Sequence, residues 1–245
     1  MKFVGLNNYI QLLSDSTFIY SLKNSIYFVG GSVAGQCGFG FLLALLLKRK
    51  VRGTNFYRTI FMIPWLLSDV IIGVMFILLF TSYGTINSIL LQFGFTPINW
   101  LTTAELAMLV VTLANIWKST SFYMFLNSAG LATIQEELYE SAQVDGASLF
   151  QRFRFITVPI VKPFVALSIL YSTITTYNYF GTIYVITYGG PLNATTVPAF
   201  YMYRVALEWG EIGYASAIGM FILVINLIFL SILMKLKLLG GGSIE

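Results

Sequence analysis

Five apolar runs, each long enough to cross a bilayer, constrain this chain more than any other feature. They cover roughly Ser25 to Leu47, Thr59 to Phe80, Leu106 to Ser128, Phe164 to Thr187 and Ile212 to Met234. A helix needs about 20 apolar residues to span the hydrocarbon core. A composition with 57% hydrophobic and 10% charged residues is also far from that of a soluble domain. The sequence therefore predicts an all-α membrane protein with about five transmembrane helices.

The basic residues mark one side of this predicted helical bundle. Ten of the 14 lysines and arginines lie in or beside two connections between runs and at the C-terminal end. They are Lys48, Arg49, Lys50, Arg52, Arg58, Arg152, Arg154, Lys162, Lys235 and Lys237. Cytoplasmic loops of membrane proteins are enriched in these residues, so this side is expected to face the cytoplasm. We interpret the net charge of +4 as a marker of topology and expect no nucleic-acid partner.

The two ends of the chain carry separate expectations. With five crossings and a cytoplasmic C-terminus, residues 1–20 are expected to form an external segment. That segment lacks the basic start and apolar core of a secretory signal, so we expect a transmembrane helix to precede it. Residues 21–238 form the predicted transmembrane domain. Residues 239–245, which end in GGGSIE, have the composition of an added flexible linker.

The chain lacks the residues that most catalytic and metal sites need. Cys37 is its only cysteine, and it has no histidine. An intrachain disulfide, a thiol-rich metal site and histidine acid-base chemistry are therefore excluded. A glycine-rich phosphate-binding loop that ends in lysine and serine or threonine is also absent. We expect a non-catalytic chain that holds no metal ion and no cofactor.

A polar segment, residues 130–163, separates the third and fourth apolar runs on the cytoplasmic side. Ile134 to Val144 contains good helix formers, and Gly146 interrupts them. Asp145 is placed to cap a second helix from Ala147 to Phe155. The two prolines that follow are expected to end this helix before the next crossing begins. The segment is therefore predicted to form two short helices with a sharp break.

The same segment carries a spaced pattern that resembles a known motif. Its members are Glu140, Ser141, Ala142, Asp145, Gly146, Ala147, Phe153, Ile156 and Pro159. The pattern resembles the cytoplasmic coupling motif of permease subunits in binding-protein-dependent ABC importers. Serine at position 141 replaces the usual alanine and Val158 the usual leucine, and both changes keep the side chain small or apolar. Further stretches that resemble the carbohydrate-uptake group are Phe3 to Leu13, Gly84 to Leu91 and Tyr188 to Thr196.

The resemblance covers nearly the whole chain and implies a type I ABC importer permease fold in the cell membrane of a prokaryote. It implies four kinds of partner: a second, similar permease subunit, two cytoplasmic ATPase subunits, an extracytoplasmic sugar-binding protein and the carbohydrate itself. ATP and magnesium would be bound by the ATPase subunits. Two alternatives stay open, namely a permease for glycerol phosphate or glycerol phosphodiesters and an ion-coupled secondary carrier.

The chemistry of the polar segment fits such a contact with an ATPase subunit. Small residues permit a short helix to enter a groove, acidic residues can pair with basic groups, and phenylalanine can supply an apolar anchor. The residues expected to act in this way are Glu140, Ser141, Ala142, Asp145, Gly146, Ala147, Phe150, Phe153 and Pro159. The alternative is that the segment is only a solvated amphipathic loop.

Polar side chains share one helical face on the third run and one on the fourth. They are Asn115, Lys118, Ser119 and Phe122, and then Ser168, Ser172, Thr175, Thr176 and Tyr179. Hydroxyl and amide groups with aromatic rings suit a neutral polyol, so these residues are predicted to line a sugar path. We expect the strongest roles from Ser172, Thr176 and Phe122. The alternative is that the serines and threonines only pack between helices.

Asp69 and Lys118 are the two ionisable residues predicted to reach mid-depth in the membrane. Counted at about 1.5 Å per residue, each lies roughly halfway along its run. An isolated ion in hydrocarbon costs at least about 2.5 kcal/mol. The sequence therefore predicts an intramembrane ion pair, although each residue could instead face water or another subunit.

Overall fold

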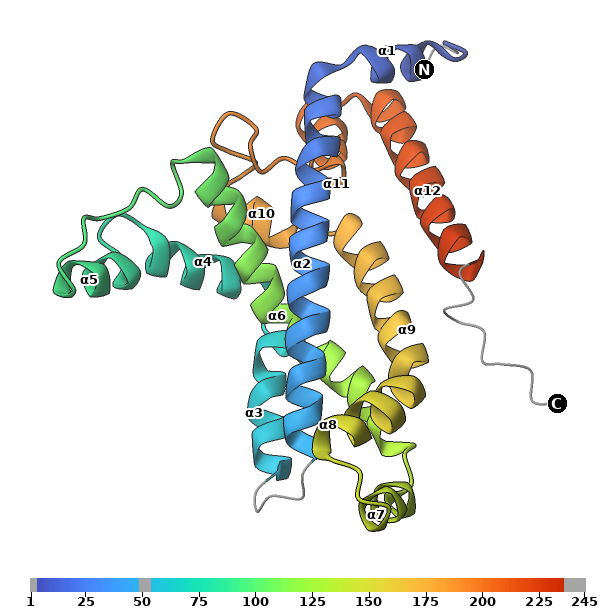
Figure 1. The fold of residues 1–245 in the computed structure, drawn as a ribbon. Coiled ribbons are helices and arrows are strands. Elements are labelled where there is room, and N and C mark those ends of the chain that lie inside the picture. The colour runs from blue at the N-terminus through green and yellow to red at the C-terminus, as the bar shows by residue number, and fades with distance from the viewer. Residues whose placement is uncertain (1–3, 49–53, 236–245) are drawn as a thin grey trace.

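The computed structural model describes residues 4–48 and 54–235, and helices joined by turns make up most of that part of the chain (Figure 1). In chain order they are α1 (Asn7–Ser14), α2 (Ser16–Lys48), α3 (Thr54–Leu66), α4 (Asp69–Phe80), α5 (Thr85–Gln92), α6 (Ala104–Ala132), α7 (Glu136–Val144), α8 (Leu149–Arg152), η1 (Phe153–Thr157), α9 (Val158–Tyr177), α10 (Gly181–Ile186), α11 (Pro198–Tyr203), η2 (Arg204–Glu208) and α12 (Ile212–Lys235), where η marks a π-helical turn. The predicted linker at 239–245 and the basic residues Arg49, Lys50, Arg52 and Lys237 lie outside the described residues. The prediction of an all-α membrane protein is confirmed.

Four helical segments in the described part of the chain are long and apolar enough to cross a membrane. They are Ser16–Lys48, Asp69–Gln92, Leu149–Tyr177 and Ile212–Ile232. The predicted third crossing, α6, has 29 residues and is long enough at about 44 Å. It is not among the four, since residues such as Asn115 and Lys118 make it more polar. At the centre of the fold α2 runs along α6 and α9 (Figure 1).

The close packing of α2 against α6 depends on glycine. At Gly40 an added Cβ would lie 2.8 Å from Tyr123 Cβ, and at Gly35 it would overlap the side chain of Ile116. Any larger residue would therefore push the two helices apart. Glycine permits this approach, which is typical of helix pairs in lipid.

The second predicted crossing is not one helix, so the prediction of a single helix from Thr59 to Phe80 is wrong. The chain breaks after α3, and the Ser68 hydroxyl accepts a hydrogen bond from the Ile71 N–H at 3.3 Å, which caps a new helix. From there α4 runs across the bundle and not along it (Figure 1). The break places Asp69 in the first turn of α4, facing the centre of the bundle.

The fourth crossing also differs from its prediction of Phe164 to Thr187. It ends at Tyr177, after which α10 turns across the bundle (Figure 1). At its N-terminal end the helix begins earlier than predicted, because α8, η1 and α9 follow one another without a gap. Pro159 and Pro163 therefore do not end a helix. They lack an N–H donor, and a π-helical turn precedes them, in which the Val158 N–H donates to the Phe153 carbonyl.

The polar segment at 130–163 has the predicted break between two short helices, but a different residue caps the second helix. Gly146 separates α7 from α8 and has a φ of +79°, a conformation that glycine adopts without strain. Ser148 caps α8 and forms a capping box with Gln151, at 3.3 and 2.7 Å. Asp145 is instead the residue that directly follows α7 and caps its C-terminal end. Its predicted role as the cap of the second helix is therefore wrong.

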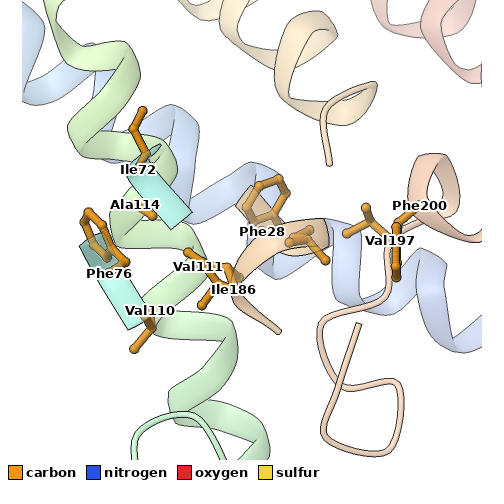
Figure 2. Packing of buried hydrophobic residues seen from close by; sticks show 10 residues of the cluster. Phe28, Ile72, Phe76, Val110, Val111, Ala114, Ile186, Val197 and Phe200 are labelled. Atoms are coloured by element: carbon orange, nitrogen blue, oxygen red, sulfur yellow. The ribbon is translucent and has the colours of Figure 1, made fainter. Parts of the chain in front are cut away.

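A buried apolar cluster fixes the two crosswise helices to the bundle (Figure 2). It consists of Phe28, Ile72, Phe76, Val110, Val111, Ala114, Ile183, Ile186, Val197 and Phe200. These side chains come from α2, α4, α6, α10 and α11 and from the turn before α11. Burial of aromatic and branched side chains stabilises this junction. The position of Asp69 at the base of α4 is therefore set by the core.

Asp15 ties the N-terminal segment to distant parts of the chain. Its Oδ1 accepts the backbone N–H of Thr17 at 2.8 Å and of Phe18 at 3.2 Å, at the start of α2. Its Oδ2 accepts the hydroxyls of Tyr201 and Tyr214, both at 2.6 Å. Burial opposes ionisation of Asp15, but these donors together outweigh it, so its pKa lies below the usual value of 3.8.

Replacing Asp15 by asparagine is expected to make stability depend less on acid. A lowered pKa means that ionised Asp15 stabilises the fold at neutral pH and that this contribution is lost as pH falls through the folded-state pKa, below 3.8. Thermal unfolding in detergent should show the variant about 1–2 kcal/mol less stable at pH 7. The difference should shrink at pH 3. An equal difference at both pH values would contradict this role.

Candidate functional site

A polar pocket of about 180 Å³ lies between α3, α6 and α9. Its lining residues are Trp65, Asn115, Lys118, Ser119, Phe122, Tyr123, Tyr171, Thr175, Thr176 and Tyr179. Seven of the nine residues predicted to line a sugar path are among them, namely Asn115, Lys118, Ser119, Phe122, Thr175, Thr176 and Tyr179. The pocket therefore combines amide, hydroxyl and ammonium groups with aromatic rings. This mixture can bind hydroxyl groups and the apolar face of a sugar ring.

Ser168 and Ser172 are the two predicted path residues that do not line this pocket. The Ser172 hydroxyl donates to Gln36 Oε1 on α2 at 2.7 Å. The Ser168 hydroxyl donates to the Phe164 carbonyl at 2.9 Å and lies 3.4 Å from Asn127 Oδ1. Both serines are fully buried. Their geometry fits the alternative of packing between helices, and their predicted role in lining a sugar path stays a prediction.

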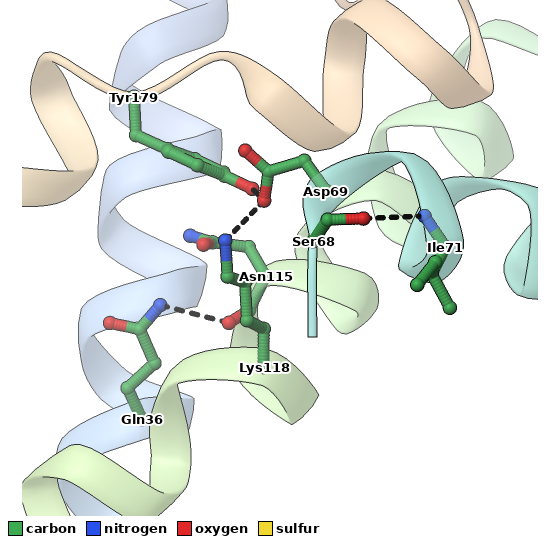
Figure 3. A network of polar contacts seen from close by, with 7 residues as sticks. All are labelled: Gln36, Ser68, Asp69, Ile71, Asn115, Lys118 and Tyr179. Carbon is green, nitrogen blue, oxygen red and sulfur yellow. Dashed lines mark hydrogen bonds and ion pairs between the residues drawn. The ribbon is translucent and has the colours of Figure 1, made fainter. Parts of the chain in front are cut away.

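Gln36 also supports the pocket from behind. Its side-chain N–H donates to the backbone carbonyl of Asn115 at 3.3 Å (Figure 3). The Asn115 side chain in turn donates to the Ser32 hydroxyl at 3.0 Å. Both α2 residues are buried. The contact between α2 and α6 therefore holds one wall of the pocket in place.

Three aromatic residues of the pocket were missing from the predicted set. The ring of Phe122 lies 5.7 Å from that of Trp65, 5.4 Å from that of Tyr123 and 5.1 Å from that of Tyr171. Tyr171 lies four residues before Thr175, so helical spacing was a signal for it. Trp65 comes from α3, and no spacing on another helix indicates its contact. The four rings form one aromatic cluster in the pocket lining, called the aromatic wall below.

Asp69, Lys118 and Tyr179 form a charged network beside the pocket (Figure 3). The Lys118 ammonium makes an ion pair with Asp69 Oδ1, and the Tyr179 hydroxyl donates to the same oxygen at 2.6 Å. The Lys118 and Asp69 side chains are 18% and 31% exposed. The structure thus brings together the two residues of the predicted ion pair. Among the described residues, no group of three or more cysteine, aspartate or glutamate side chains is placed to hold a metal ion.

Exposed apolar side chains gather where α7 and α8 meet, at the tip of the bundle that is predicted to face the cytoplasm. They are Val144, Leu149, Phe150 and Phe155, between 72% and 88% exposed. Phe153, predicted as an anchor, is only partly exposed, and Phe155 presents its ring in its place. A hollow of about 280 Å³ beside them is lined by residues that include Ala142, Asp145, Gly146, Ala147 and Arg152. The tip offers a small-residue hollow next to apolar side chains.

The remaining predicted coupling residues lie around this tip. Glu140 and Ser141 are exposed on α7, and the Ser141 hydroxyl donates to the Glu137 carbonyl at 2.8 Å. Pro159 lies further along the chain, in the first turn of α9. Phe150 is on the tip itself. The structure therefore brings the predicted set together, except for Pro159 behind the π-helical turn.

Tyr139 fastens the tip to the membrane helices. Its hydroxyl accepts a hydrogen bond from Lys48 Nζ, at the end of α2, at 2.9 Å. The same hydroxyl lies 2.7 Å from the hydroxyl of Thr157 in η1. The Lys48 ammonium also lies 4.1 Å from the centre of the Tyr139 ring, a cation-π distance. One side chain thus connects α7 to α2 and to the start of α9.

Known proteins share this architecture. A family model described as a binding-protein-dependent transport system inner membrane component matches residues 36–236. The trehalose/maltose transport system permease protein of Thermococcus litoralis is 38% identical over 237 residues, which are 95% of this chain and 79% of that protein.

Two solved structures resemble the fold closely. One is a bacterial ABC transporter involved in the import of the acidic polysaccharide alginate, with a TM-score of 0.88 and 26% identity over 97% of this chain and 84% of that chain. The other is the alginate transporter in complex with a periplasmic protein that holds an alginate pentasaccharide, with the same TM-score and identity over 98% and 85%. The predicted type I ABC importer permease fold is confirmed. Because the family model covers most of the chain, this protein belongs to the family of binding-protein-dependent transport system inner membrane components.

Proposed function

We propose that this permease subunit forms part of the translocation path of an ATP-driven sugar importer. The observation that carries the proposal is the polar pocket, in which an aromatic wall faces hydroxyl and amide groups. Sugars bind to such surfaces through stacking and hydrogen bonds. The related permease of Thermococcus litoralis is named for trehalose and maltose transport, which supports the same class of substrate.

The partners of the subunit belong to the same proposal. A second permease subunit would complete the path, two ATPase subunits would bind ATP and magnesium, and an extracytoplasmic protein would deliver the sugar. The alginate transporter solved with its periplasmic protein supports the last of these. The proposed location is the cell membrane of a prokaryote. In this arrangement the chain itself is not an enzyme.

The cytoplasmic tip is the proposed contact with an ATPase subunit. Its hollow is lined by small residues, and apolar side chains surround it. Exposed apolar side chains beside a hollow of small residues suit tight binding of the tip in a groove of a partner surface. Glu140 and Asp145 would add pairing with basic groups of the partner. Tyr139 would carry displacement of the tip to α2 and η1.

The direct test is the activity of the complete importer in liposomes. The purified assembly, with its binding protein, should hydrolyse ATP faster when maltose or trehalose is present and should accumulate that sugar. Glycerol phosphate should have no effect, since the charge of Lys118 is already balanced by Asp69. Stimulation by glycerol phosphate alone would favour the alternative substrate class. Membership of the family argues against a secondary carrier that works without an ATPase.

Alanine at Phe122 or Thr176 is expected to weaken sugar uptake. Phe122 on α6 contacts the other rings of the aromatic wall, and Thr176 lines the same pocket from α9. Loss of the Phe122 ring, which can stack on a sugar, or of the Thr176 hydroxyl, which can bond to one, should raise the KM for uptake by about tenfold. Thr173→Ala is the matched control, because Thr173 lies on the same helix outside the pocket lining. Unchanged kinetics and unchanged sugar preference in both variants would argue against the lining role.

A further inference from the structure

Lys118 is the only residue of the polar pocket lining that is charged at neutral pH. Its ammonium faces Asp69, which does not itself line the pocket. The charge that a ligand meets is therefore the sum of a cation in the wall and an anion directly behind it. With both present, the wall is electrically balanced.

Asp69 is held so that it cannot withdraw from Lys118. The Tyr179 hydroxyl donates to the same carboxylate oxygen that pairs with the ammonium. The residue lies in the first turn of α4, where the helix dipole favours a negative charge. Its other carboxylate oxygen packs against Gly181, where any Cβ would overlap it. Contacts with Lys118 of α6, with Tyr179 just before α10 and with Gly181 at the start of α10 therefore hold the carboxylate in place.

The same fold carries substrates of different charge in other proteins. One solved relative takes part in the import of an acidic polysaccharide, while the permease from Thermococcus litoralis is named for two uncharged sugars. The fold alone therefore does not decide between neutral and acidic sugars. A local charge in the pocket can decide, because charges at a site of low dielectric interact strongly.

We propose that Asp69 is a specificity-determining residue that makes this pocket select uncharged sugars over acidic ones. It does so by serving as the counter-ion of Lys118, so that a sugar carboxylate would bring a second anion to a single cation. Like charges brought together in this way weaken binding. The inference rests on the proposed function, since it assumes that sugar enters this pocket.

Asp69→Asn is the decisive variant, because asparagine keeps the shape of the side chain and removes its charge. The complete importer, held in lipid nanodiscs without binding protein, is titrated with maltose, trehalose and maltobionate, the carboxylate made by oxidising the reducing end of maltose. Isothermal titration calorimetry measures binding of each sugar to the assembled importer. The variant should bind maltobionate about tenfold more tightly than the unmodified importer does, because the sugar carboxylate replaces the lost counter-ion.

Two further variants separate charge selection from a purely structural role. Asp69→Asn combined with Lys118→Gln removes both charges and should restore the preference for neutral sugar, without a gain for maltobionate. Glu105→Gln removes an acidic residue from the start of the same α6 helix, outside the pocket, and should leave both affinities unchanged. Size-exclusion chromatography establishes that each complex is assembled.

The outcomes distinguish this inference from the proposed function. If the unmodified importer binds neutral sugar and Asp69→Asn gains no affinity for maltobionate, charge selection by Asp69 is overturned while the sugar path stands. Charge selection is also overturned if the double variant gains affinity for maltobionate as the single variant does. If the unmodified importer binds neither maltose nor trehalose, the proposed function fails, and this inference fails with it.

Discussion

Replacement of Gly146 by valine is expected to lower sugar uptake at least about tenfold while the assembled complex still hydrolyses ATP. Gly146 has a φ of +79°, and a β-branched residue in that region costs about 1–2 kcal/mol. Among the described residues, no atom beyond the two chain neighbours of Gly146 lies within 4 Å of an added Cβ, so overpacking against that part of the subunit is not the cause. The turn between α7 and α8 must change shape instead, and the proposed contact with the ATPase would lose its geometry.

The matched variant is Gly146→Asn, because asparagine tolerates the left-handed conformation better than any β-branched residue. It should retain most of the uptake. Uptake and ATP hydrolysis are measured together in liposomes, and their ratio gives the coupling. A valine variant with a normal ratio would remove the main support for the tip as the coupling contact.

Replacement of Lys118 by methionine is expected to be the most destabilising single change near the pocket. Methionine has a similar length but leaves Asp69 without its cation. Removal of one partner from a buried ion pair costs about 3–5 kcal/mol. Both side chains are partly exposed to the pocket, at 18% and 31%, so we expect a loss near about 3 kcal/mol. Thermal unfolding in detergent measures it.

A charge swap tests the pair directly. Asp69→Lys combined with Lys118→Asp should recover much of the stability and uptake that either single change removes. Lys23→Met, at an exposed position of α2, is the control and should alter stability by less than about 0.5 kcal/mol. If the swapped chain is no more stable than Lys118→Met, the direct pair makes little contribution.

Helical spacing predicted which polar residues share one face of each pocket helix, but not which part of the chain each of these residues contacts. Ser172, Thr175 and Thr176 lie at i, i+3 and i+4 on α9, so the sequence places them together. In the fold, the hydroxyl of Ser172 meets Gln36 on α2, while the two threonines border the pocket. One face of α9 thus contacts α2 at one position and borders the pocket at two others. Only the tertiary arrangement of α2 and α6 decides which residue meets which neighbour.

Hydropathy alone concealed the break in the second crossing. The polar pair Ser68 and Asp69 is flanked by apolar residues on both sides, so a window average over about 20 residues runs through it without a break. The local signals were a proline at position 64 and a serine that can cap a helix three residues before Ile71. Those signals indicate where a helix can restart, but not that α4 lies across the bundle. Contacts with α6 and α10 set that direction.

The unbroken run of α8, η1 and α9 joins the tip, where α7 and α8 meet, to the pocket through one continuous helical segment. Leu149–Tyr177 is a single helical segment of 29 residues, with Phe150 near one end and Thr176 near the other. A continuous helix can move as one body, so a displacement at one end can reach the other end without repacking of the side chains between them. The π-helical turn beside Pro159 interrupts the regular hydrogen bonds of this helix, so we expect the helix to bend most easily there. In the proposed importer, the stiffness of this turn would therefore determine how far a displacement of the tip moves the end of α9 that lines the pocket.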